Sequence, residues 1–346
     1  MGLQIGELVP RKSIRIDDLK RKIIAVDAFN TIYQFLSNIR QVDGTPLMDS
    51  KGRITSHLSG LFYRTTNLIA RGIKLVYVFD GKSPDLKYKT NKQRDERKSD
   101  AEKKYYEAKK EGKESDMYKY SRQTVRVTDE IIEESKRLIR ALGLPVVQAP
   151  GEGEAQAAYL SKKGCYAVAS QDYDSLLFGA PVVIQNLTLA KRRRVASGAY
   201  IPVEPELIEL EKVLNTLQIG HEQLICLGIL SGTDFNPGGI KGIGPKKALA
   251  LVQKYKQPYL IFQAIEQQLL KEGREMEFNW QEIFELFKKP NIIKEYNLNF
   301  KQVNEEELKN LLCKEHDFSE DRVLSALGKL REAKEINKQK DLDQWF

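Results

Sequence analysis

Apolar and polar residues alternate along the first half of the chain with two different periods. Short apolar runs with the length of buried strands are each followed by a segment with helical spacing or, in one case, by a highly charged segment. The strand-like runs occupy residues 22–27, 73–80, 144–148 and 165–172, and the helical segments occupy residues 28–39, 153–164 and 174–179. This alternation predicts an α/β fold with a mostly parallel central sheet flanked by helices.

The second half of the chain has a different pattern. Residues 182–197 resemble a β-hairpin near the edge of the sheet, and helical spacing predominates from about residue 204. The predicted helices cover residues 205–218, 221–232, 248–255 and 319–336. The chain therefore combines an α/β part with a mainly helical part.

The charged segment at residues 82–126 contains good helix formers but little apolar periodicity, and Gly112 is its predicted break. It holds 15 basic and 9 acidic residues, so most of the formal net charge of +8 lies there. Charge runs of this kind are usually solvated helices or disordered loops. A substrate-binding insertion is the other interpretation, because the segment follows Asp80, at the strand edge where α/β proteins bind ligands.

Composition limits the class of protein. The 346 residues are 41% hydrophobic, which allows a sizeable core, and no apolar stretch approaches the roughly 20 residues of a membrane span. We therefore expect an intracellular protein without a membrane partner. The three cysteines and three histidines are scattered, so neither a disulfide framework nor a zinc site is predicted. The basic excess favours a polyanionic partner.

Acidic residues follow several predicted strands at the point where each strand ends. Asp27, Asp80 and Asp172 end three of the strand-like runs. Because the carboxyl ends of parallel strands meet at one edge of a sheet, these side chains should face a common crevice. Four further acids join the set, namely Glu152, Glu154, Asp174 and Asp234. Each alone would more often be a helix cap or a turn residue, but six or seven at one edge cannot all be.

A carboxylate cluster this dense needs cations or raised pKa values. Two carboxylates 4 Å apart repel by about 4 kcal/mol at an effective dielectric constant of 20. Oxygen ligands without nearby histidine or cysteine suit Mg²⁺, with Mn²⁺ as a substitute, better than zinc. Two such ions about 4 Å apart can activate water and stabilise both oxygens of an in-line phosphoryl displacement. The acids therefore predict a two-metal site for phosphoryl transfer.

Two other phosphate chemistries disagree with the sequence. In the segment that starts at Gly239, a Walker loop would need lysine where the chain has Pro245, so ATP is not indicated. An aspartyl-phosphate phosphatase would need an acid two residues after Asp27, where the chain has Phe29. Neither ATP nor a phosphoenzyme is therefore predicted.

Residues 238–251, GGIKGIGPKKALAL, place glycines directly before a predicted helix that begins with two lysines. An ordinary helix-turn-helix connection is one interpretation. The residue order also fits a helix-hairpin-helix, in which glycine N–H groups, the helix start and lysines contact a DNA phosphate. The residues concerned are Gly239, Gly242, Gly244, Lys246 and Lys247. Such a motif contacts the backbone without reading sequence, so binding should weaken steeply with salt.

Several segments together resemble the flap endonucleases of the structure-specific 5′ nuclease superfamily. The matching segments are MGLQ, VDAFNTIYQFL, TSHLSGLFYRT, YVFDGKSPDLK, APGEGEAQAA, ASQDYDSLLFG and LSGTDFNPGGIKGIGPKKAL. The resemblance runs essentially end to end and implies a PIN-like 5′ nuclease fold. It implies that the seven acids bind two Mg²⁺ and that the helix-hairpin-helix is a candidate site for a monovalent cation.

The resemblance assigns roles that spacing cannot show. Lys87 and Arg94 match the basic pair that approaches the scissile phosphate, and Tyr33 matches the aromatic residue that stacks near the cleaved nucleotide. Residues 82–126 correspond to a helical arch, through or under which the 5′ single strand passes. Three further residues are implied to contact DNA: Thr55 and Arg64, which bound the region near a one-nucleotide 3′-flap pocket, and Gly2, near the active site.

The reaction implied by the resemblance is metal-dependent hydrolysis of a DNA phosphodiester at the base of a 5′ flap. Related activities are 5′–3′ exonuclease cleavage and RNA-primer removal, in lagging-strand maturation and repair. A hypothesis from another class is a non-catalytic DNA-binding protein that serves as a clamp adaptor, motivated by the glycine turn and the tail. All seven acids are present, which favours the enzyme.

The C-terminal sequence QKDLDQWF fits the pattern by which proteins bind a PCNA-type sliding clamp, although a chance match is the alternative. The pattern residues are Gln339, Leu342, Trp345 and Phe346. We expect a single nuclease domain at 1–336, with a helix-hairpin-helix region at 228–257, and a flexible clamp-binding tail at 337–346. We also expect the nuclease to be a monomer. Because no basic nuclear-targeting tail follows the pattern, we expect an archaeal protein in the cytoplasm, associated with the nucleoid. A eukaryotic protein would be nuclear.

Overall fold

The computed structural model describes residues 3–41, 43–188, 192–194 and 200–342. The chain forms two compact units, each built from three segments of the sequence. The first unit comprises residues 1–14, 80–93 and 148–294, and the second unit comprises residues 15–79, 94–147 and 295–346. The units interleave along the chain, so neither is a continuous half of the sequence. The expected single domain at 1–336 stays a prediction.

The strands of the second unit confirm the parallel α/β pattern. β2 (Ile23–Asp27) and β3 (Lys74–Phe79) pair in parallel along the whole of β2. β4 (Val146–Gln148) lies next to β3, and its last residue belongs to the first unit. Tyr77 of β3 is fully buried, and its hydroxyl lies 2.7 Å from the Thr65 hydroxyl. The apolar run at 73–80 is therefore a buried strand, as predicted.

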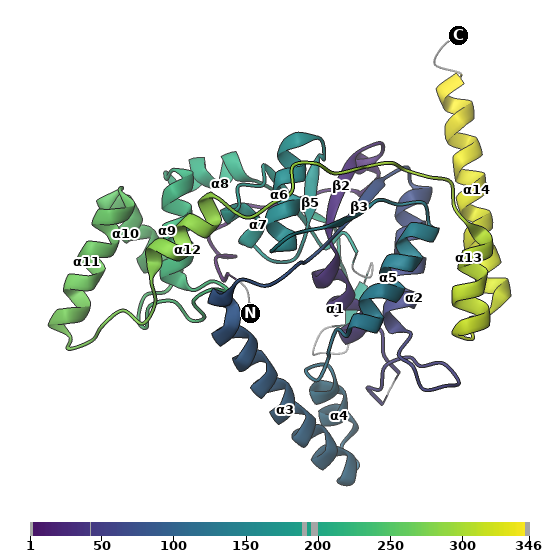
Figure 1. Cartoon of the computed structure of the whole chain (residues 1–346), viewed down its shortest axis with the longest axis horizontal. Coiled ribbons are helices and arrows are strands. Elements are labelled where there is room, and N and C mark those ends of the chain that lie inside the picture. Colours follow the sequence, from purple (N-terminus) through teal and green to yellow (C-terminus); the bar gives the residue numbers. More distant parts are fainter. Residues whose placement is uncertain (1–2, 42, 189–191, 195–199, 343–346) are drawn as a thin grey trace. The chain divides into compact units, whose positions relative to one another are not determined.

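The helices of the second unit pack against one another around α2. They are η1 (Ile16–Leu19), α1 (Ala28–Asn38), α2 (Ser56–Ala70), α5 (Asp129–Ala141), α13 (Glu305–Lys309), the π-helical turn η3 (Asn310–Glu315) and α14 (Glu320–Leu342). α14, drawn in yellow in Figure 1, contacts α2 and α13. A Cβ on Gly60 of α2 would lie 2.2 Å from the Phe35 ring of α1, so glycine permits this close approach.

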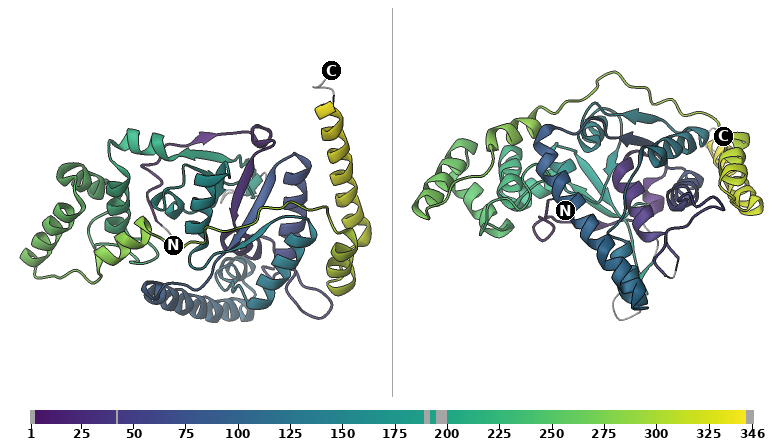
Figure 2. Two further views of the ribbon diagram at one scale, coloured as in Figure 1. Left: turned by 45° about the horizontal axis from the view of Figure 1, so that its top comes forward. Right: turned by 60° about the horizontal axis from the view of Figure 1, so that its bottom comes forward.

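Two charged helices occupy the predicted insertion at residues 82–126. A short 3₁₀ turn, η2 (Asp85–Lys87), leads into α3 (Tyr88–Lys110), and α4 (Glu114–Ser121) follows. Figure 2 shows α3 as the long blue helix. Gly112 lies between the two helices with φ +68°, a left-handed conformation that favours glycine, so the predicted break is confirmed.

The sheet of the first unit is mixed. Its strands run in the order β1 (Lys12–Ser13), β9 (Glu206–Glu209), β6 (Val182–Gln185) and β5 (Ala167–Ala169). β5 and β6 are parallel, whereas β9 is antiparallel to both β6 and β1. The α/β class is confirmed, with an antiparallel part that the alternating pattern did not predict.

Two local predictions in the first unit are wrong. In the described part of residues 182–197 the two strands do not pair with each other, because β6 pairs with β5 and β9 while β7 (Arg192–Arg194) pairs with β8 (Tyr200–Pro202). The predicted helix at 205–218 begins only at Leu210, because Glu206–Glu209 form β9. Pairing with β6 buries the apolar side chains of this segment, which outweighs its helical propensity.

The first unit contains several helices that follow β4 in the chain. They are α6 (Gly153–Lys163), α7 (Asp174–Leu177), α8 (Leu210–Leu217), α9 (His221–Ser231), α10 (Pro245–Tyr255), α11 (Pro258–Lys271) and α12 (Trp280–Lys288). α10, α11 and α12 gather around α9, and Trp280 stacks on Phe262 with ring centroids 4.3 Å apart. Among the described residues, no helix is long and apolar enough to cross a bilayer.

Candidate active site

The first unit contains six of the seven predicted acids, and each lies after a strand, at the start of a helix or in a turn. Asp80 follows β3 in the chain, and Asp172 follows β5. Glu152 immediately precedes α6, whose first turn contains Glu154, and Asp174 is the first residue of α7. The sixth is Asp234, in the turn after α9.

Glu152 occupies the N-cap position of α6 but does not cap the helix. Its side chain makes no hydrogen bond to the helix backbone. Glu152 Oε2 instead accepts a short hydrogen bond from Lys87 Nζ, which also lies 3.4 Å from Asp234 Oδ2. The three side chains are only 11–14% exposed. Lys87 therefore places a buried ammonium between two carboxylates.

The glycine between Glu152 and Glu154 has a defined role. The Gly153 backbone N–H donates a 2.7 Å hydrogen bond to Asp80 Oδ1. A Cβ on Gly153 would lie 2.3 Å from the same oxygen, so a side chain here would displace Asp80. The spacing of the two glutamates thus lets the backbone of α6 approach Asp80 closely.

The carboxylates carry more negative charge than Lys87 neutralises. Burial, together with the charge of Glu152, raises the pKa of Asp80 to about 6. Burial and the charges of Asp234 and Asp172 raise the pKa of Asp174 well above its usual range. Burial alone would lower the pKa of Lys87, but the neighbouring carboxylates raise it overall. An additional cation would therefore be stabilised in this cluster.

Glu154 is held by two serine hydroxyls that sequence reasoning missed. Ser170 Oγ donates to Glu154 Oε1 at 3.0 Å, and Ser175 Oγ donates to the same oxygen at 3.2 Å. The Asp172 N–H donates to Ser170 Oγ at 3.3 Å. These bonds connect the start of α6 to the loop between β5 and α7, which contains Asp172. The signal that the sequence offered for this contact is Ser175, which directly follows Asp174.

The donor set fits a hard divalent cation. All six acids offer oxygen, and the buried Asp174 Oδ1 has no hydrogen-bond partner. In the part of the chain that the structure describes, no three Asp, Glu, His or Cys side chains already converge as a metal cage. Lys87 contacts both Glu152 and Asp234, so a bound cation would have to replace its contacts.

The glycine turn before α10 is built around a buried asparagine. Asn236 Nδ2 donates to the Ile229 carbonyl at 2.7 Å, and Asn236 Oδ1 accepts from the Thr233 hydroxyl at 2.7 Å. Gly239 and Gly242 have positive φ, +58° and +90°. The turn therefore has a fixed shape, and glycine satisfies its backbone conformation at both positions.

A cavity of about 880 Å³ lies beside the end of this turn and the start of α10, and it reaches one acid of the cluster, Asp172. Gly244, Lys246 and Lys247 line one side, and Arg11 and Asp172 line the cavity with them. No atom lies within 4 Å of a Cβ built on Gly244, which leaves open space in front of the α10 N-terminus. The turn, the helix start and two lysines thus face the same cavity as an acid of the cluster.

Comparison with known proteins assigns these features to one family. Residues 4–101 match the XPG N-terminal domain, and residues 143–234 match the XPG I-region. The chain is 52% identical over 348 residues to flap endonuclease 1 of Thermococcus onnurineus, covering 100% of this chain and 99% of the relative. The chain belongs to the flap endonuclease 1 family.

Two further members of the flap endonuclease 1 family support this assignment. Flap endonuclease 1 of Pyrococcus furiosus is 51% identical over 348 residues, with coverage of 100% of this chain and 99% of the relative. The solved structure of flap endonuclease-1 from Methanococcus jannaschii matches with a TM-score of 0.75 and 41% identity, covering 96% of this chain and 98% of that chain. The family resemblance predicted from motifs is confirmed.

The other predicted residues of this family member belong to the second unit. Asp27 Oδ1 caps α1 by accepting the Asn30 N–H at 3.0 Å. Tyr33 on α1 is 41% exposed, and Arg94 lies half-buried on α3. Thr55 is buried immediately before α2, and Arg64 lies half-buried within α2, where burial lowers its pKa. Their predicted roles stay predictions.

Some predicted positions near the chain ends fall outside the described residues. These are Gly2, Trp345 and Phe346. The backbone of α14 ends at Leu342, so Gln339 and Leu342 lie on its last turns. The predicted clamp-binding tail therefore begins within a helix.

Proposed function

We propose that the protein is a structure-specific nuclease that hydrolyses a DNA phosphodiester at the base of a 5′ flap, in lagging-strand maturation and repair. The observation that carries this proposal is the buried carboxylate cluster around Lys87, next to a cavity that the glycine turn and two lysines line. The relatives of this chain that are named flap endonuclease 1 support the substrate class. Exonuclease cleavage from a 5′ end and RNA-primer removal would use the same site.

Two Mg²⁺ ions, or Mn²⁺ in their place, would be held by the six acids of the first unit. The family resemblance adds Asp27 as a further proposed ligand. The ions would supply a water nucleophile at neutral pH and stabilise charge on the phosphate oxygens. Gly153 would keep Asp80 in place through its N–H. Lys87, once released from Glu152, would orient the scissile phosphate, and Arg94 and Tyr33 would assist at the reacting nucleotide.

Duplex DNA would bind at the helix-hairpin-helix. Backbone N–H groups at the start of α10 and the ammonium groups of Lys246 and Lys247 would contact one phosphate strand without reading its sequence. Both lysines are accessible from the cavity that also reaches Asp172. A monovalent cation bound at the Gly239–Gly244 turn would strengthen the same phosphate contact.

The charged helices α3 and α4 would bind the single-stranded part of the flap. Aromatic side chains are unusually exposed there: Tyr88 is 71% exposed, Tyr106 is 55% exposed and Tyr118 is 37% exposed. Exposed tyrosines among lysines are typical of surfaces that stack bases and attract the phosphate backbone. The segment at 82–126 would therefore act as the arch that the sequence predicts.

The C-terminal pattern would bind a PCNA-type sliding clamp, with the nuclease itself acting as a monomer. Gln339, Leu342, Trp345 and Phe346 supply the polar and apolar side chains that such an anchor needs. Deletion of residues 339–346 is expected to abolish stimulation of cleavage by the clamp while leaving unstimulated cleavage unchanged. Loss of unstimulated cleavage would contradict a role restricted to the clamp.

The function is tested by cleavage of labelled double-flap DNA, with single-stranded DNA and blunt duplex as control substrates. Each substrate is incubated with Mg²⁺ and with EDTA. We expect cleavage confined to the flap junction and dependent on Mg²⁺. If the protein binds the flap tightly but never cleaves it, the non-catalytic clamp adaptor becomes the better account, and clamp binding by the tail would be its main function.

A further inference from the structure

The loop between β5 and α7 leads into two of the six acids of the first unit. Asp172 lies in this loop, and Asp174 is the first residue of α7. Tyr173 lies between them and is half-buried. Because a single residue separates the two acids, a shift of Tyr173 would move both carboxylates. A contact that holds Tyr173 therefore also holds Asp172 and Asp174.

Backbone hydrogen bonds hold this loop on both sides of Asp172. Gln185 at the end of β6 is buried, and its Nε2 donates to the Gln171 carbonyl at 2.8 Å. The Tyr173 carbonyl accepts the Leu176 N–H at 2.9 Å in the first turn of α7. These bonds fix the backbone of the loop, but they do not set the direction of the Tyr173 ring.

The N-terminal segment of the first unit contacts the tip of the Tyr173 ring. Ile5 is fully buried and anchors this segment, and its carbonyl accepts the Leu8 N–H at 2.9 Å in a tight turn. Gly6 lies in that turn. A Cβ built on Gly6 would lie 2.9 Å from Tyr173 Oη, so glycine permits the close approach. The backbone at residue 6 therefore limits how the Tyr173 ring can lie.

Arg11 joins this N-terminal turn to the ring and to the sheet. Its Nη2 donates to the Gly6 carbonyl at 2.7 Å, and its guanidinium carbon lies 5.9 Å from the centroid of the Tyr173 ring. A guanidinium at this distance is attracted to an aromatic ring. Its Nη1 donates to Glu206 Oε2 on β9 at 3.4 Å. Arg11 thus holds the N-terminal turn, Tyr173 and β9 together.

We propose that Arg11 is a positioning residue for Asp172 and Asp174, because it holds the Tyr173 ring against the N-terminal turn. The inference rests on the proposed function, in which these acids bind divalent ions. Among the described residues, none forms a hydrogen bond with the buried Asp174 Oδ1, so the backbone of the loop decides where this atom points. Gly6, Arg11, Asp172 and Tyr173 also line one cavity of about 880 Å³.

Arg11 acts through the position of the ring rather than through its charge. Glu206 balances the guanidinium, and this ion pair adds little stability by itself because both side chains are 34% exposed. The hydrogen bond to the Gly6 carbonyl is charge-assisted and therefore stronger. The sign of the effect separates the two possibilities. An unbalanced cation near Asp172 would repel a metal ion, so its removal would strengthen metal binding, whereas loss of a positioning residue weakens it.

The test measures Mn²⁺ binding to the metal-free, full-length protein without DNA. Electron paramagnetic resonance reports the free ion, and the sites that are lost in Asp174→Ala identify binding at the acids. Arg11→Met removes the cation and keeps an apolar stem. Because loss of a group that orients metal ligands weakens metal binding by roughly 10- to 100-fold, we expect Arg11→Met to raise the Kd for Mn²⁺ about 10-fold.

Lys288→Met is the matched control. Lys288 Nζ lies 5.6 Å from the centroid of the Phe284 ring and 2.6 Å from Glu222 Oε1, in the same unit. Like Arg11, it is a partly exposed cation that joins an aromatic ring to a glutamate, but it lies on α12, which contains none of the six acids. Its Kd for Mn²⁺ should stay within about 2-fold of the wild type.

Rescue separates positioning from a general loss of structure. Arg11→Lys keeps a cation for the ring, so its Kd should lie within about 3-fold of the wild type. Gly6→Ala would place a Cβ against Tyr173 Oη and should weaken Mn²⁺ binding as Arg11→Met does. Tyr173→Phe removes that hydroxyl and with it the closest contact of the Cβ. Gly6→Ala combined with Tyr173→Phe should therefore bind Mn²⁺ more tightly than Gly6→Ala alone, which a general loss of structure would not produce.

The outcomes are distinguishable. If the wild type and Asp174→Ala bind Mn²⁺ equally, the proposed metal site is wrong, and the role of Arg11 with it. If the wild type binds Mn²⁺ at the acids and Arg11→Met has the wild-type Kd, the role of Arg11 alone is wrong. Tighter binding by Arg11→Met would also overturn the inference, because Arg11 would then act through its charge. If Arg11→Met does not fold, as judged by circular dichroism, Gly6→Ala with and without Tyr173→Phe decides the question by the same Kd.

Discussion

Replacement of Lys87 with methionine should destabilise the metal-free protein. Methionine keeps an apolar stem against Phe235, whose ring centroid lies 5.8 Å from Lys87 Nζ, but removes the charge between Glu152 and Asp234. Removing one partner of a buried ion pair costs about 3–5 kcal/mol. Asp80, with its pKa of about 6, can take up a proton and relieve part of the repulsion. We therefore expect a loss near the lower limit, about 3 kcal/mol in the free energy of unfolding.

The assay is urea denaturation followed by tryptophan fluorescence, because Trp280 lies in the same unit. The denaturation is measured once with EDTA and once with Mg²⁺. An ion that binds the folded state adds stability, and Mg²⁺ should therefore stabilise Lys87→Met more than the wild type, because the variant lacks the ammonium that partly neutralises the carboxylates. Lys289→Met is the control, because that side chain is 76% exposed, and should change stability by less than about 0.5 kcal/mol. If Lys87→Met is as stable as the wild type in EDTA, Lys87 does not neutralise the cluster.

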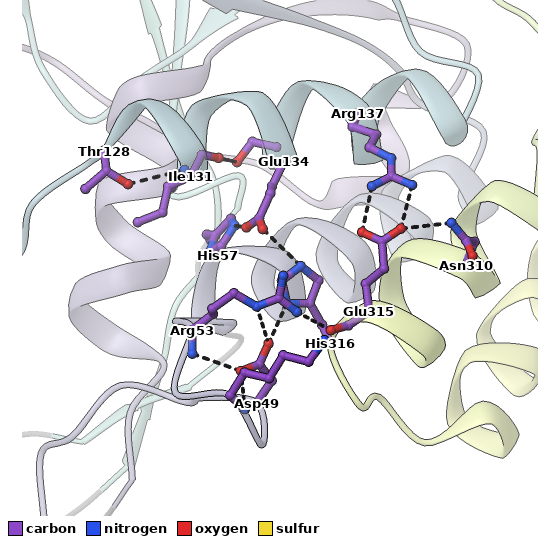
Figure 3. A network of polar contacts seen from close by, with 12 residues as sticks. Asp49, Arg53, His57, Thr128, Ile131, Glu134, Arg137, Asn310, Glu315 and His316 are labelled. Atoms are coloured by element: carbon purple, nitrogen blue, oxygen red, sulfur yellow. Dashed lines mark hydrogen bonds and ion pairs between the residues drawn. The ribbon is translucent and has the colours of Figure 1, made fainter.

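Three further perturbations test the roles of Gly153, of Asp49 and of the two lysines at the start of α10. Gly153→Ala should lower kcat at least about 100-fold with the fold intact, because the Cβ of the new alanine would displace Asp80. Stopped-flow cleavage measures this change in kcat. Acid should destabilise the second unit, because hydrogen bonds to Asp49 outweigh the effect of burial (Figure 3) and lower its pKa to about 2 in the folded state, compared with about 3.9 in the unfolded chain. The contribution of Asp49 to the free energy of unfolding is therefore present above about pH 4 and is lost as the pH falls toward 2. Urea unfolding at a series of pH values measures this loss. Alanine at both Lys246 and Lys247 should weaken duplex binding and reduce the dependence of log K on log salt by about 0.9 for each phosphate that the protein no longer neutralises.

Two of these perturbations have matched controls, Gly164→Ala and Lys271→Ala, and Asp49→Asn is the variant that tests the acid effect. Gly164→Ala should leave kcat unchanged, because nothing lies within 4 Å of a Cβ built on this residue. Asp49→Asn should abolish the acid-dependent part of the stability while also lowering stability at neutral pH. Lys271→Ala, at the far end of α11, should leave the salt dependence unchanged. Equal effects of a control and its test variant would contradict the corresponding assignment.

The acids of the first unit were largely predictable from the sequence. Strand-like runs that end in Asp80 and Asp172 locate these residues at the carboxyl ends of strands, and the structure brings Asp80 together with Glu152 and Asp234. The pairing of Lys87 with Glu152 was not predictable, because it joins residues 65 apart in sequence and depends on how η2 meets α6. Local patterns contain no information on such contacts.

A buried network in the second unit that contains two histidines shows the same limit more strongly (Figure 3). In the sequence the three histidines are scattered and suggest no site, yet His57 and His316 both contact Glu134. Their proximity depends on the packing of α2, α5 and η3, which periodicity does not encode. The wrong prediction of a helix at Glu206–Glu209, which form β9, has the same cause. Pairing of this segment with β6 outweighs its helical propensity.

We expect the buried carboxylates to hold the metal ions that the reaction needs, and Asp174→Ala tests this assignment. Single-turnover cleavage of double-flap DNA in Mg²⁺ is measured together with the Kd for the same DNA. Because metal ions contribute several kcal/mol to the transition state, we expect a rate about 1,000-fold lower, with the Kd within about 3-fold of the wild type. Cleavage at the wild-type rate would contradict the assignment of this cluster as the active site.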